Sequence, residues 1–149
     1  MTQPLFDTLH HVCIVVPELD KAVAYYESLG IGPWQNFPSL DAFTHDLVGV
    51  PAEDFLLLRY AYADLGNVQL QLCEPAEGDT PQWRFLSSHG QGVFHLGFSV
   101  PDVNAAEAQG AMLGLPPLIH GRTAVGRGFT YFDTRSAGAG VTLQVRSSV

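Results

Sequence analysis

The chain has 149 residues, of which 46% are hydrophobic and 15% are charged. This composition is typical of one compact domain that buries an apolar core, and it excludes a disordered chain. The net charge of −8 argues against nucleic acid or an anionic membrane surface as a general partner.

Location is indicated by three negative observations. No apolar run approaches the roughly 18 residues that a membrane-spanning helix needs, so we expect no membrane partner. The N-terminus lacks the basic and then apolar pattern of a signal peptide. The two cysteines, Cys13 and Cys73, fall inside predicted strands and do not suggest a disulfide framework. Together these features predict a cytoplasmic protein.

The first predicted elements are a strand over 10–16 and a helix after it. Alternation along the strand puts His11 and Cys13 on one face and aliphatic side chains on the other. Pro17 suits the first turn of the helix, and Gly30 suits its end. We expect the helix to pack its apolar stripe on the aliphatic face of the strand.

The middle of the first half is harder to interpret. A strand over 33–37 contains Trp34, which we interpret as a core side chain rather than a ligand-stacking surface. Residues 39–54 are predicted to form a polar loop whose charges are mostly exposed, although one carboxylate or His45 could reach a pocket. A further strand is predicted over 55–63.

Two glutamines lie inside the next predicted strand, over 68–73. Gln69 and Gln71 share a face opposite three aliphatic side chains. A buried amide must find hydrogen-bond partners, so glutamines at such positions indicate a purpose. The linker that follows is predicted to hold a short helix that begins after Thr80 and ends before Gly90.

The second half repeats this pattern. A strand over 92–100 places His95 opposite an aliphatic face, and a helix is predicted from Asp102. Strands follow over 129–133 and 141–146, with Gln144 on the polar face of the last one. Arg122 and Arg127 lie in a loop predicted over 121–128, before the first of these strands, where we expect solvent exposure rather than contact with an anionic ligand.

The two halves are related by an internal duplication. The segment HVCIVVPELDKAVAYYESLG, which opens at His11, matches HLGFSVPDVNAAEAQGAMLG, which opens at His95, at a constant offset of 84 residues. The segment around Gln71 matches that around Gln144 at an offset of 73. We therefore predict a single domain, residues 1–149, built from modules at about 8–75 and 92–147.

The duplication turns single polar residues into a candidate set. If the two modules form one curved sheet, the equivalent residues His11, Gln71, His95 and Gln144 line a common cavity. Two imidazoles and two amide oxygens can bind a divalent metal and leave positions for water or substrate. The alternative is a polar layer inside a barrel that water satisfies.

At this point a family resemblance emerges. The segments HHVCIVVPELDKAVAYY, LQLCEP and FHLGFSVPD resemble the vicinal oxygen chelate superfamily, which holds glyoxalases, bleomycin-resistance proteins and extradiol dioxygenases. Methylmalonyl-CoA epimerases and their glyoxalase-like relatives are the most similar branch, and the resemblance runs from about His10 to Val145. It implies an α+β fold of paired βαβββ modules that form a curved, partly open mixed sheet with helices outside. It also implies a homodimer.

The resemblance implies a metal site as well. The family's ligand pattern of His, Gln or Glu, His and Glu carries over onto His11, Gln71 and His95. The fourth position is Gln144, where the epimerases have glutamate. An amide adds no negative charge and exchanges no proton near pH 7, so a catalytic base would have to come from elsewhere, and residues 41–54 are where we look first.

Three functions remain open from the sequence. The first is a metal-dependent enzyme, an epimerase, isomerase or lyase that stabilises an enolate of a small carbonyl or acyl-thioester substrate with Co, Ni, Mn or Zn. The second is a metal-free, drug-sequestering binding protein with Trp34 and Trp83 as stacking surfaces. The third is an iron oxygenase, against which Gln144 counts because that site needs a carboxylate.

Overall fold

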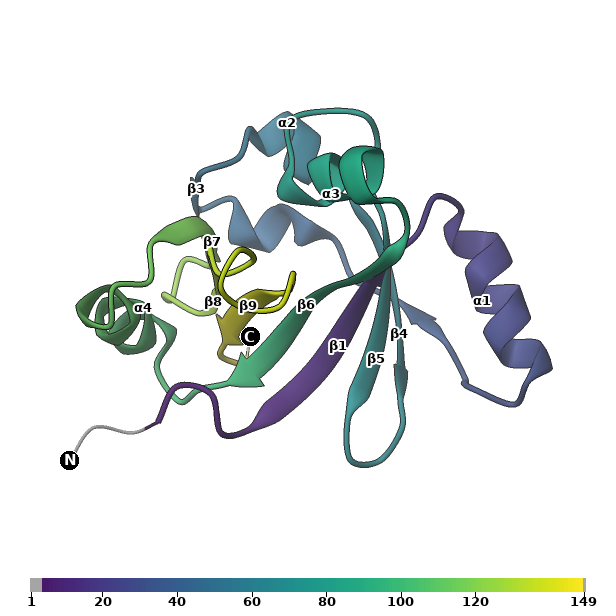
Figure 1. The fold of residues 1–149 in the computed structure, drawn as a ribbon, viewed down its shortest axis with the longest axis horizontal. Coiled ribbons are helices and arrows are strands. Elements are labelled where there is room, and N and C mark those ends of the chain that lie inside the picture. The colour runs from purple at the N-terminus through teal and green to yellow at the C-terminus, as the bar shows by residue number, and fades with distance from the viewer. Residues whose placement is uncertain (1–3, 149) are drawn as a thin grey trace. The chain divides into compact units, whose positions relative to one another are not determined.

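The computed structural model describes residues 4–148, which fall into two compact units. Of these residues, the unit that we call the N-unit holds 11–40 and 50–94. The C-unit holds 4–10, 41–49 and 95–148. Each unit combines a mixed β-sheet with helices, which confirms the predicted α+β class (Figure 1).

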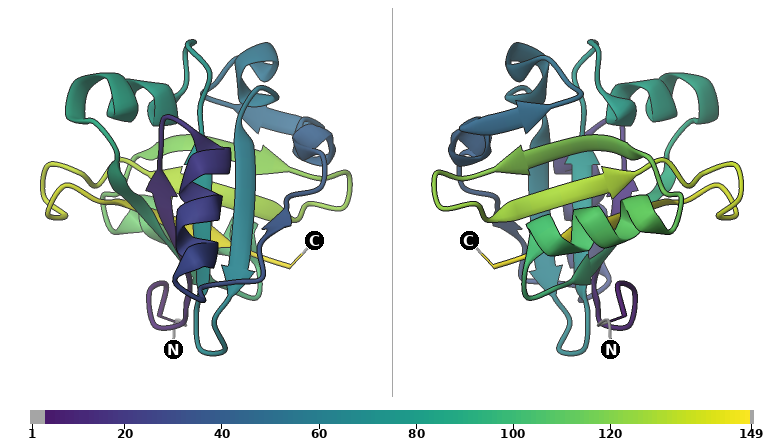
Figure 2. Two further views of the ribbon diagram at one scale, coloured as in Figure 1. Left: turned by 90° about the vertical axis from the view of Figure 1, so that its right-hand side faces the viewer. Right: turned by 90° about the vertical axis from the view of Figure 1, so that its left-hand side faces the viewer.

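The N-unit contains four strands in the order β2-β4-β5-β1. β1 and β5 are parallel, and the other neighbouring pairs are antiparallel. Helix α1 lies across β4 and β5, as the left view of Figure 2 shows. The elements are β1 (Leu9–Val15, of which residues 11–15 belong to this unit), α1 (Leu19–Ser28), β2 (Gln35–Asn36), α2 (Ala52–Phe55), β4 (Arg59–Asp64), β5 (Gln69–Glu74) and α3 (Pro81–His89).

The interface of α1 is apolar, as predicted, but its main partner strands are β4 and β5 rather than β1. Its buried centre consists of Val16, Leu19, Ala61 and Leu72. Trp34 packs against this cluster, its ring stacks on Tyr26 with centroids 5.9 Å apart, and its indole nitrogen donates a hydrogen bond to the Ile31 carbonyl. The interpretation of Trp34 as a core side chain is therefore confirmed.

The start of α1 differs from the prediction. Pro17 precedes the helix, which begins at Leu19 after an extended Glu18 whose side chain makes no capping hydrogen bond. The free N–H of Leu19 donates instead to the carboxylate of Glu74, on β5, over 2.8 Å. A strand residue thus supplies the cap that helix N-termini need.

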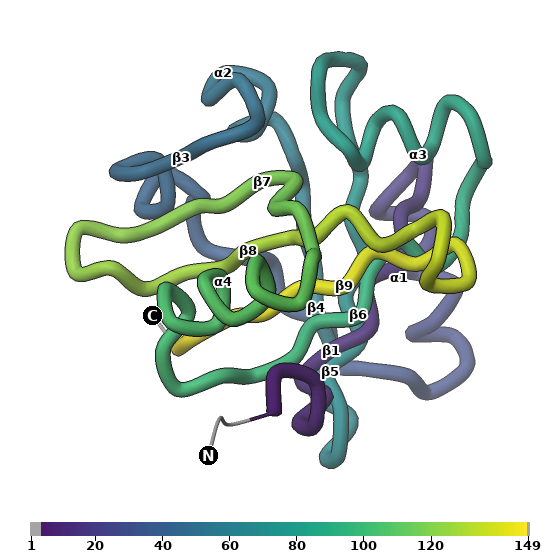
Figure 3. Tube along the Cα trace, turned by 60° about the vertical axis from the view of Figure 1, so that its left-hand side comes forward, coloured from purple at the N-terminus to yellow at the C-terminus, as the bar shows by residue number. Residues whose placement is uncertain are grey.

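The C-unit contains the strands in the order β6-β9-β8-β7-β3. β6 and β9 are parallel, and the other pairs are antiparallel. Figure 3 traces the β7–β8 hairpin, and the right view of Figure 2 shows α4 lying along it. The elements are β3 (Asp46–Val48), the C-terminal part of β6 (Gly92–Ser99), α4 (Val103–Met112), β7 (Pro117–Arg122), β8 (Gly128–Phe132) and β9 (Thr142–Arg146).

Helix α4 carries its own cap and packs closely on its strands. The Asp102 carboxylate accepts hydrogen bonds from Asn104 N–H at 3.0 Å and Ala105 N–H at 3.2 Å. Gly110 faces Phe132, and a Cβ at this glycine would lie 2.5 Å from the phenyl ring. Only glycine therefore allows α4 to approach β8 so closely.

Several local predictions were wrong. The predicted loop over 39–54 contains a 3₁₀ helix (Leu40–Phe43), β3 and α2, and β3 pairs with β7. The predicted strand over 55–63 begins only at Arg59, because Phe55 is buried at the end of α2. Strand β7 occupies part of a predicted loop. The linker helix is confirmed, with the Thr80 hydroxyl accepting from Trp83 N–H at 3.0 Å.

Candidate functional site

In the N-unit, two predicted site residues lie on neighbouring parallel strands. β1 and β5 pair so that His11 lies beside Gln69, and Cys13 beside Gln71. Side chains two residues apart on a strand share a face, so His11 and Gln71 project from the same side of the sheet. Both are buried, with 3% and 5% of their surface exposed.

The C-unit repeats this arrangement at every step. β6 and β9 pair so that His95 lies beside Thr142, and Gly97 beside Gln144. His95 and Gln144 are likewise buried on one face, with 1% and 6% exposed. In each copy, the residue that pairs with the glutamine lies two positions after the histidine. The histidine and the glutamine are therefore offset by two residues on adjacent parallel strands.

A third matched position was not predicted from the sequence. In each copy a tyrosine lies opposite the glutamine across an antiparallel pair, Tyr62 beside Gln71 and Tyr131 beside Gln144. The Tyr131 ring also contacts the His95 imidazole, with centroids 4.9 Å apart. The match is hidden in the sequence because the connection between the paired strands spans 65–68 in the first copy and 133–141 in the second.

The chemistry of these side chains fits a divalent cation. Burial lowers the pKa of His95 to about 3, so its imidazole is neutral at pH 7, the form that binds metal. The Gln144 amide oxygen is buried and accepts no hydrogen bond from residues 4–148. The Gln71 amide nitrogen donates to Gln69 over 2.7 Å, which leaves the Gln71 oxygen for a ligand. Each copy thus offers one imidazole and one amide oxygen.

The acidic segment over 41–54 supplies no evident base. Asp46 lies on β3 with one oxygen 3.4 Å from His120 Nε2, on the α4 side of the sheet. Asp54 accepts a hydrogen bond from Asp79 N–H at 3.0 Å. His45 and Glu53 are exposed. The two aspartates are therefore engaged with other groups.

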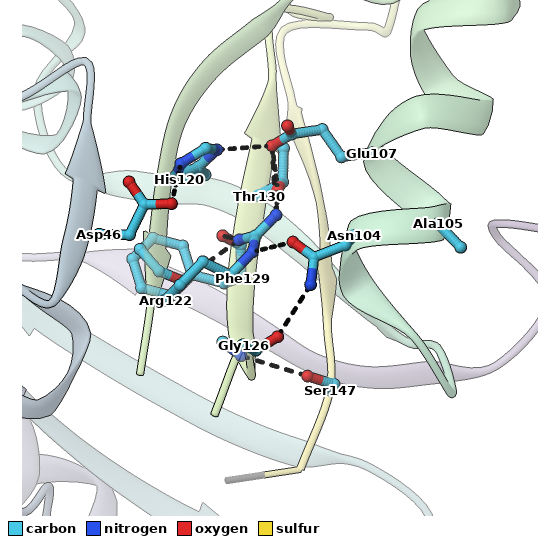
Figure 4. Close-up of polar contacts among 12 residues, drawn as sticks. Asp46, Asn104, Ala105, Glu107, His120, Arg122, Gly126, Phe129, Thr130 and Ser147 are labelled. Atoms are coloured by element: carbon cyan, nitrogen blue, oxygen red, sulfur yellow. Dashed lines mark hydrogen bonds and ion pairs between the residues drawn. The ribbon is translucent and has the colours of Figure 1, made fainter. Parts of the chain in front are cut away.

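A second polar cluster lies between α4 and β7–β8 (Figure 4). At its centre, one oxygen of Glu107 accepts a hydrogen bond from the Thr130 hydroxyl at 2.7 Å. The same oxygen lies 2.8 Å from His120 Nδ1 and 3.3 Å from Arg122 Nη2. We call this cluster the α4 network, and its members are Asp46, Asn104, Glu107, His120, Arg122 and Thr130.

Arg122 is the buried member of the α4 network, with 3% exposed, so the expectation that it faces solvent was wrong. Each guanidinium nitrogen has a partner. Nε donates to Asn104, Nη1 to the carbonyls of Gly121 and Phe129, and Nη2 to Thr130 and Glu107. A buried guanidinium that is saturated in this way has no donor left for a ligand.

The same contacts set the charge of Glu107. Burial raises the pKa of this carboxyl, but hydrogen bonds from Thr130 and His120, together with the charges of His120 and Arg122, outweigh burial. The pKa of Glu107 is therefore held below its usual range, and the carboxylate stays ionised. We interpret the α4 network as a polar clamp between helix and sheet. Within 4–148, no three His, Cys, Asp or Glu side chains gather as a metal site.

The family of the chain follows from comparison with known proteins. A sequence model of the Glyoxalase/Bleomycin resistance protein/Dioxygenase superfamily matches residues 10–131. The chain belongs to this superfamily, which confirms the predicted resemblance. Within residues 4–148, no helix has both the length and the apolarity needed to cross a membrane.

Methylmalonyl-CoA epimerases stand out among its relatives. The human mitochondrial enzyme is 30% identical over 99 residues, which cover 66% of this chain and 49% of the human protein. The mouse enzyme is 27% identical, with 66% and 48% covered. The chain therefore spans about half the length of the curated relatives it matches.

Solved epimerase structures share the fold. The Mycobacterium tuberculosis methylmalonyl-CoA epimerase superposes with a TM-score of 0.73 at 21% identity, covering 100% of this chain and 93% of that one. A methylmalonyl-CoA epimerase in complex with methylmalonyl-CoA and NH4+ gives a TM-score of 0.71 at 23% identity, covering 97% and 96%. The predicted architecture of paired βαβββ modules is thereby confirmed.

Proposed function

We propose that this chain is a methylmalonyl-CoA epimerase-like enzyme that moves the α-proton of a small acyl thioester. The observation that carries the proposal is the matched pair of half-sets, His11 with Gln71 and His95 with Gln144, at identical register positions in the two copies. A buried histidine and glutamine that serve packing alone have no reason to recur in the same register.

Each half-set is proposed to supply ligands for a divalent metal. A bound metal would polarise the thioester carbonyl and stabilise the enolate that forms when the α-proton leaves. The chain's own contribution is to keep His95 neutral by burial and to present the unpaired oxygen of Gln144. Because Gln144 is uncharged, the metal keeps its full positive charge toward an anionic substrate.

The drug-sequestering alternative loses one of its supports. Trp34, one of the two proposed stacking surfaces, is packed on Tyr26 between α1 and the N-unit sheet. The Trp34 ring is partly buried, and the face that stacks on Tyr26 is closed to a drug. No observation favours the oxygenase, since the predicted ligand set contains no carboxylate. A homodimer remains a prediction.

The test is α-proton exchange. The purified full-length protein is incubated with methylmalonyl-CoA in deuterated water with Co2+, Ni2+, Mn2+ or Zn2+, and deuterium at the α-carbon is measured by mass spectrometry. We expect exchange with at least one metal, and its loss in His11→Ala and His95→Ala. His10→Ala is the matched control, because His10 is half-buried and adjacent in sequence but points to the opposite face of β1.

Metal content gives an independent readout. Gently purified wild type should retain near-stoichiometric metal that His11→Ala loses, and Gln144→Glu should bind it more tightly because a carboxylate adds charge. Wild-type protein that stays empty with all four metals and shows no exchange would refute the proposed function.

A further inference from the structure

The face of the C-unit sheet that carries His95 has an unusual charge. Because residues opposite one another in antiparallel strands share a face, the register places Tyr131 and Phe129 on this side beside Gln144 and Arg146. Among the described residues of β3, β6, β7, β8 and β9 on this face, none is Asp or Glu. In a chain of net charge −8, this face bears one permanent charge, and it is positive.

That charge belongs to Arg146, whose side chain has no partner among residues 4–148. Its neighbours in register are Ser99 and Phe129, neither of which is acidic. The side chain is half-buried, and within residues 4–148 it makes no ion pair and no side-chain hydrogen bond. A guanidinium has five donors, and removing it from water without an acceptor costs free energy.

Two comparisons within the chain show that this is not the usual state of an arginine here. Arg122, on the opposite face of the same sheet, has a partner for every guanidinium nitrogen. At the equivalent position of the first copy, 73 residues earlier, the chain has Cys73. The cationic side chain is therefore present in one copy only, on a face whose other functional positions are matched.

Two further groups on the same strand point to a ligand. The Gln144 amide oxygen and the Thr142 hydroxyl are buried and have no hydrogen-bond partner in the described part of the chain. Both residues share the face of Arg146 at alternate positions along β9. Three polar groups in a row, each short of a partner, are the signature of a site that a bound molecule completes.

We propose that Arg146 binds a carboxylate of the substrate and so selects acyl thioesters that carry a second, free acid group. This inference deepens the proposed function, on which it rests for the thioester. The planar guanidinium fork matches a carboxylate with two parallel hydrogen bonds.

The spacing indicates which anion is bound. Residues two apart on a strand are separated by about 7 Å, so Arg146 lies within reach of a group on the same small acyl unit that meets Gln144. The phosphates of coenzyme A lie at the far end of the pantetheine arm, much farther from the acyl carbon. A carboxylate on the acyl group is therefore the anion that fits.

The experiment compares two thioesters that differ by one carboxylate. Titration calorimetry at pH 7 gives dissociation constants of methylmalonyl-CoA and propionyl-CoA for wild type, Arg146→Gln, Arg146→Lys and Arg127→Gln. We expect wild type to bind methylmalonyl-CoA ~10- to 100-fold more tightly, Arg146→Gln to lose this preference, and Arg146→Lys to keep part of it. Arg127→Gln is the matched control, because it removes the same charge from an exposed arginine.

The other outcomes are decisive. A preference that survives in Arg146→Gln overturns the inference, and equal weakening of both thioesters assigns Arg146 to the coenzyme phosphates instead. Malonate tests the anion site without any need for turnover. It should raise the Tm of wild type but not that of Arg146→Gln. If malonate does so while no thioester exchanges, the anion site stands and the epimerase proposal fails. If neither malonate nor a thioester binds, the inference falls.

Discussion

The two copies of the duplicated module differ most where the helix meets the sheet. At equivalent positions, Val23 and Ala61 of the first copy become Glu107 and Thr130 of the second. The first pair lies in an apolar interface, whereas the second is joined by a 2.7 Å hydrogen bond inside the α4 network. One backbone arrangement is thus held together by two different kinds of interaction.

The opposite face of the sheet behaves differently. There the histidine, the glutamine and the tyrosine recur in both copies, down to the strand register. Interfaces that only need to be filled can change chemistry as long as their members change together. A face that must present particular atoms to a ligand cannot change its chemistry in this way. Because of this contrast, we assign function to the faces that carry His11 and His95.

The largest expected effect comes from making the second copy resemble the first. Glu107→Val leaves the Arg122 guanidinium buried without its charge partner, so we expect a loss of about 2–4 kcal/mol in the free energy of unfolding. Urea denaturation measures it. The double variant Glu107→Val, Arg122→Met should recover most of the loss, while Glu27→Val, on an exposed position of α1, should cost little. A double variant no more stable than the single one would contradict this account of the network.

The same residue predicts a pH dependence. The folded-state pKa of Glu107 is lowered, so its stabilising contribution is present above the unfolded value near 4.5 and is lost as pH falls through the folded value. His120 and Arg122 lie within ion-pair distance of this carboxylate, and Asp46 lies 3.4 Å from the other ring nitrogen of His120. Thermal unfolding between pH 7 and pH 3 should show a smaller decline for Glu107→Gln than for wild type. Parallel curves would exclude Glu107 as a source of the acid sensitivity.

The two helix caps provide a smaller test. Glu74→Ala and Asp102→Ala should each cost about 1 kcal/mol, because each removes the acceptor for the first N–H groups of a helix. Glu18→Ala should cost clearly less, since Glu18 occupies the cap position of α1 without capping it. Chemical denaturation of the three variants checks the order. A larger effect at Glu18 than at Glu74 would show that the helix is not capped from the strand.

The last prediction concerns the reactivity of the two cysteine thiols, which occur in the first copy only. Burial raises the pKa of Cys13 well above its usual value and that of Cys73 to about 12, so neither forms a thiolate at neutral pH. In the native protein, a disulfide-exchange reagent should label both thiols no faster than the chain unfolds. In protein unfolded by urea, both should react at the rate of a free thiol. Rapid labelling of the native protein would show that the strand positions open locally.

The sequence predicted the helices and strands that have a clear local pattern and recur in both halves of the chain. Both main helices occupy equivalent spans, and His95 and Gln144 lie where the alternation placed them. Strand β7 was missed because Pro117 and Gly121 resemble loop residues. Proline is tolerated at the first position of the strand, and Gly121 is needed because a Cβ would lie 2.8 Å from the Phe129 ring.

The burial of Arg122 was beyond sequence reasoning for a different reason. Its partners lie at Asn104, Glu107 and Thr130, and no pattern of local spacing reveals that α4 and β8 bring them together. Tyr62 and Tyr131 were missed because loops of different length separate them from their glutamines. Long-range pairing decides all of these positions.

The close contact between Gly110 and Phe132 has a consequence for how the chain reaches its native state. The equivalent position of α1 is Tyr26, which fills space beside Trp34. A tyrosine brought against Phe132 would collide with it, and a glycine brought against Trp34 would leave a hole. Each helix therefore fits its own strands, and an exchange of partners between these two similar segments would create a collision in one copy and a cavity in the other.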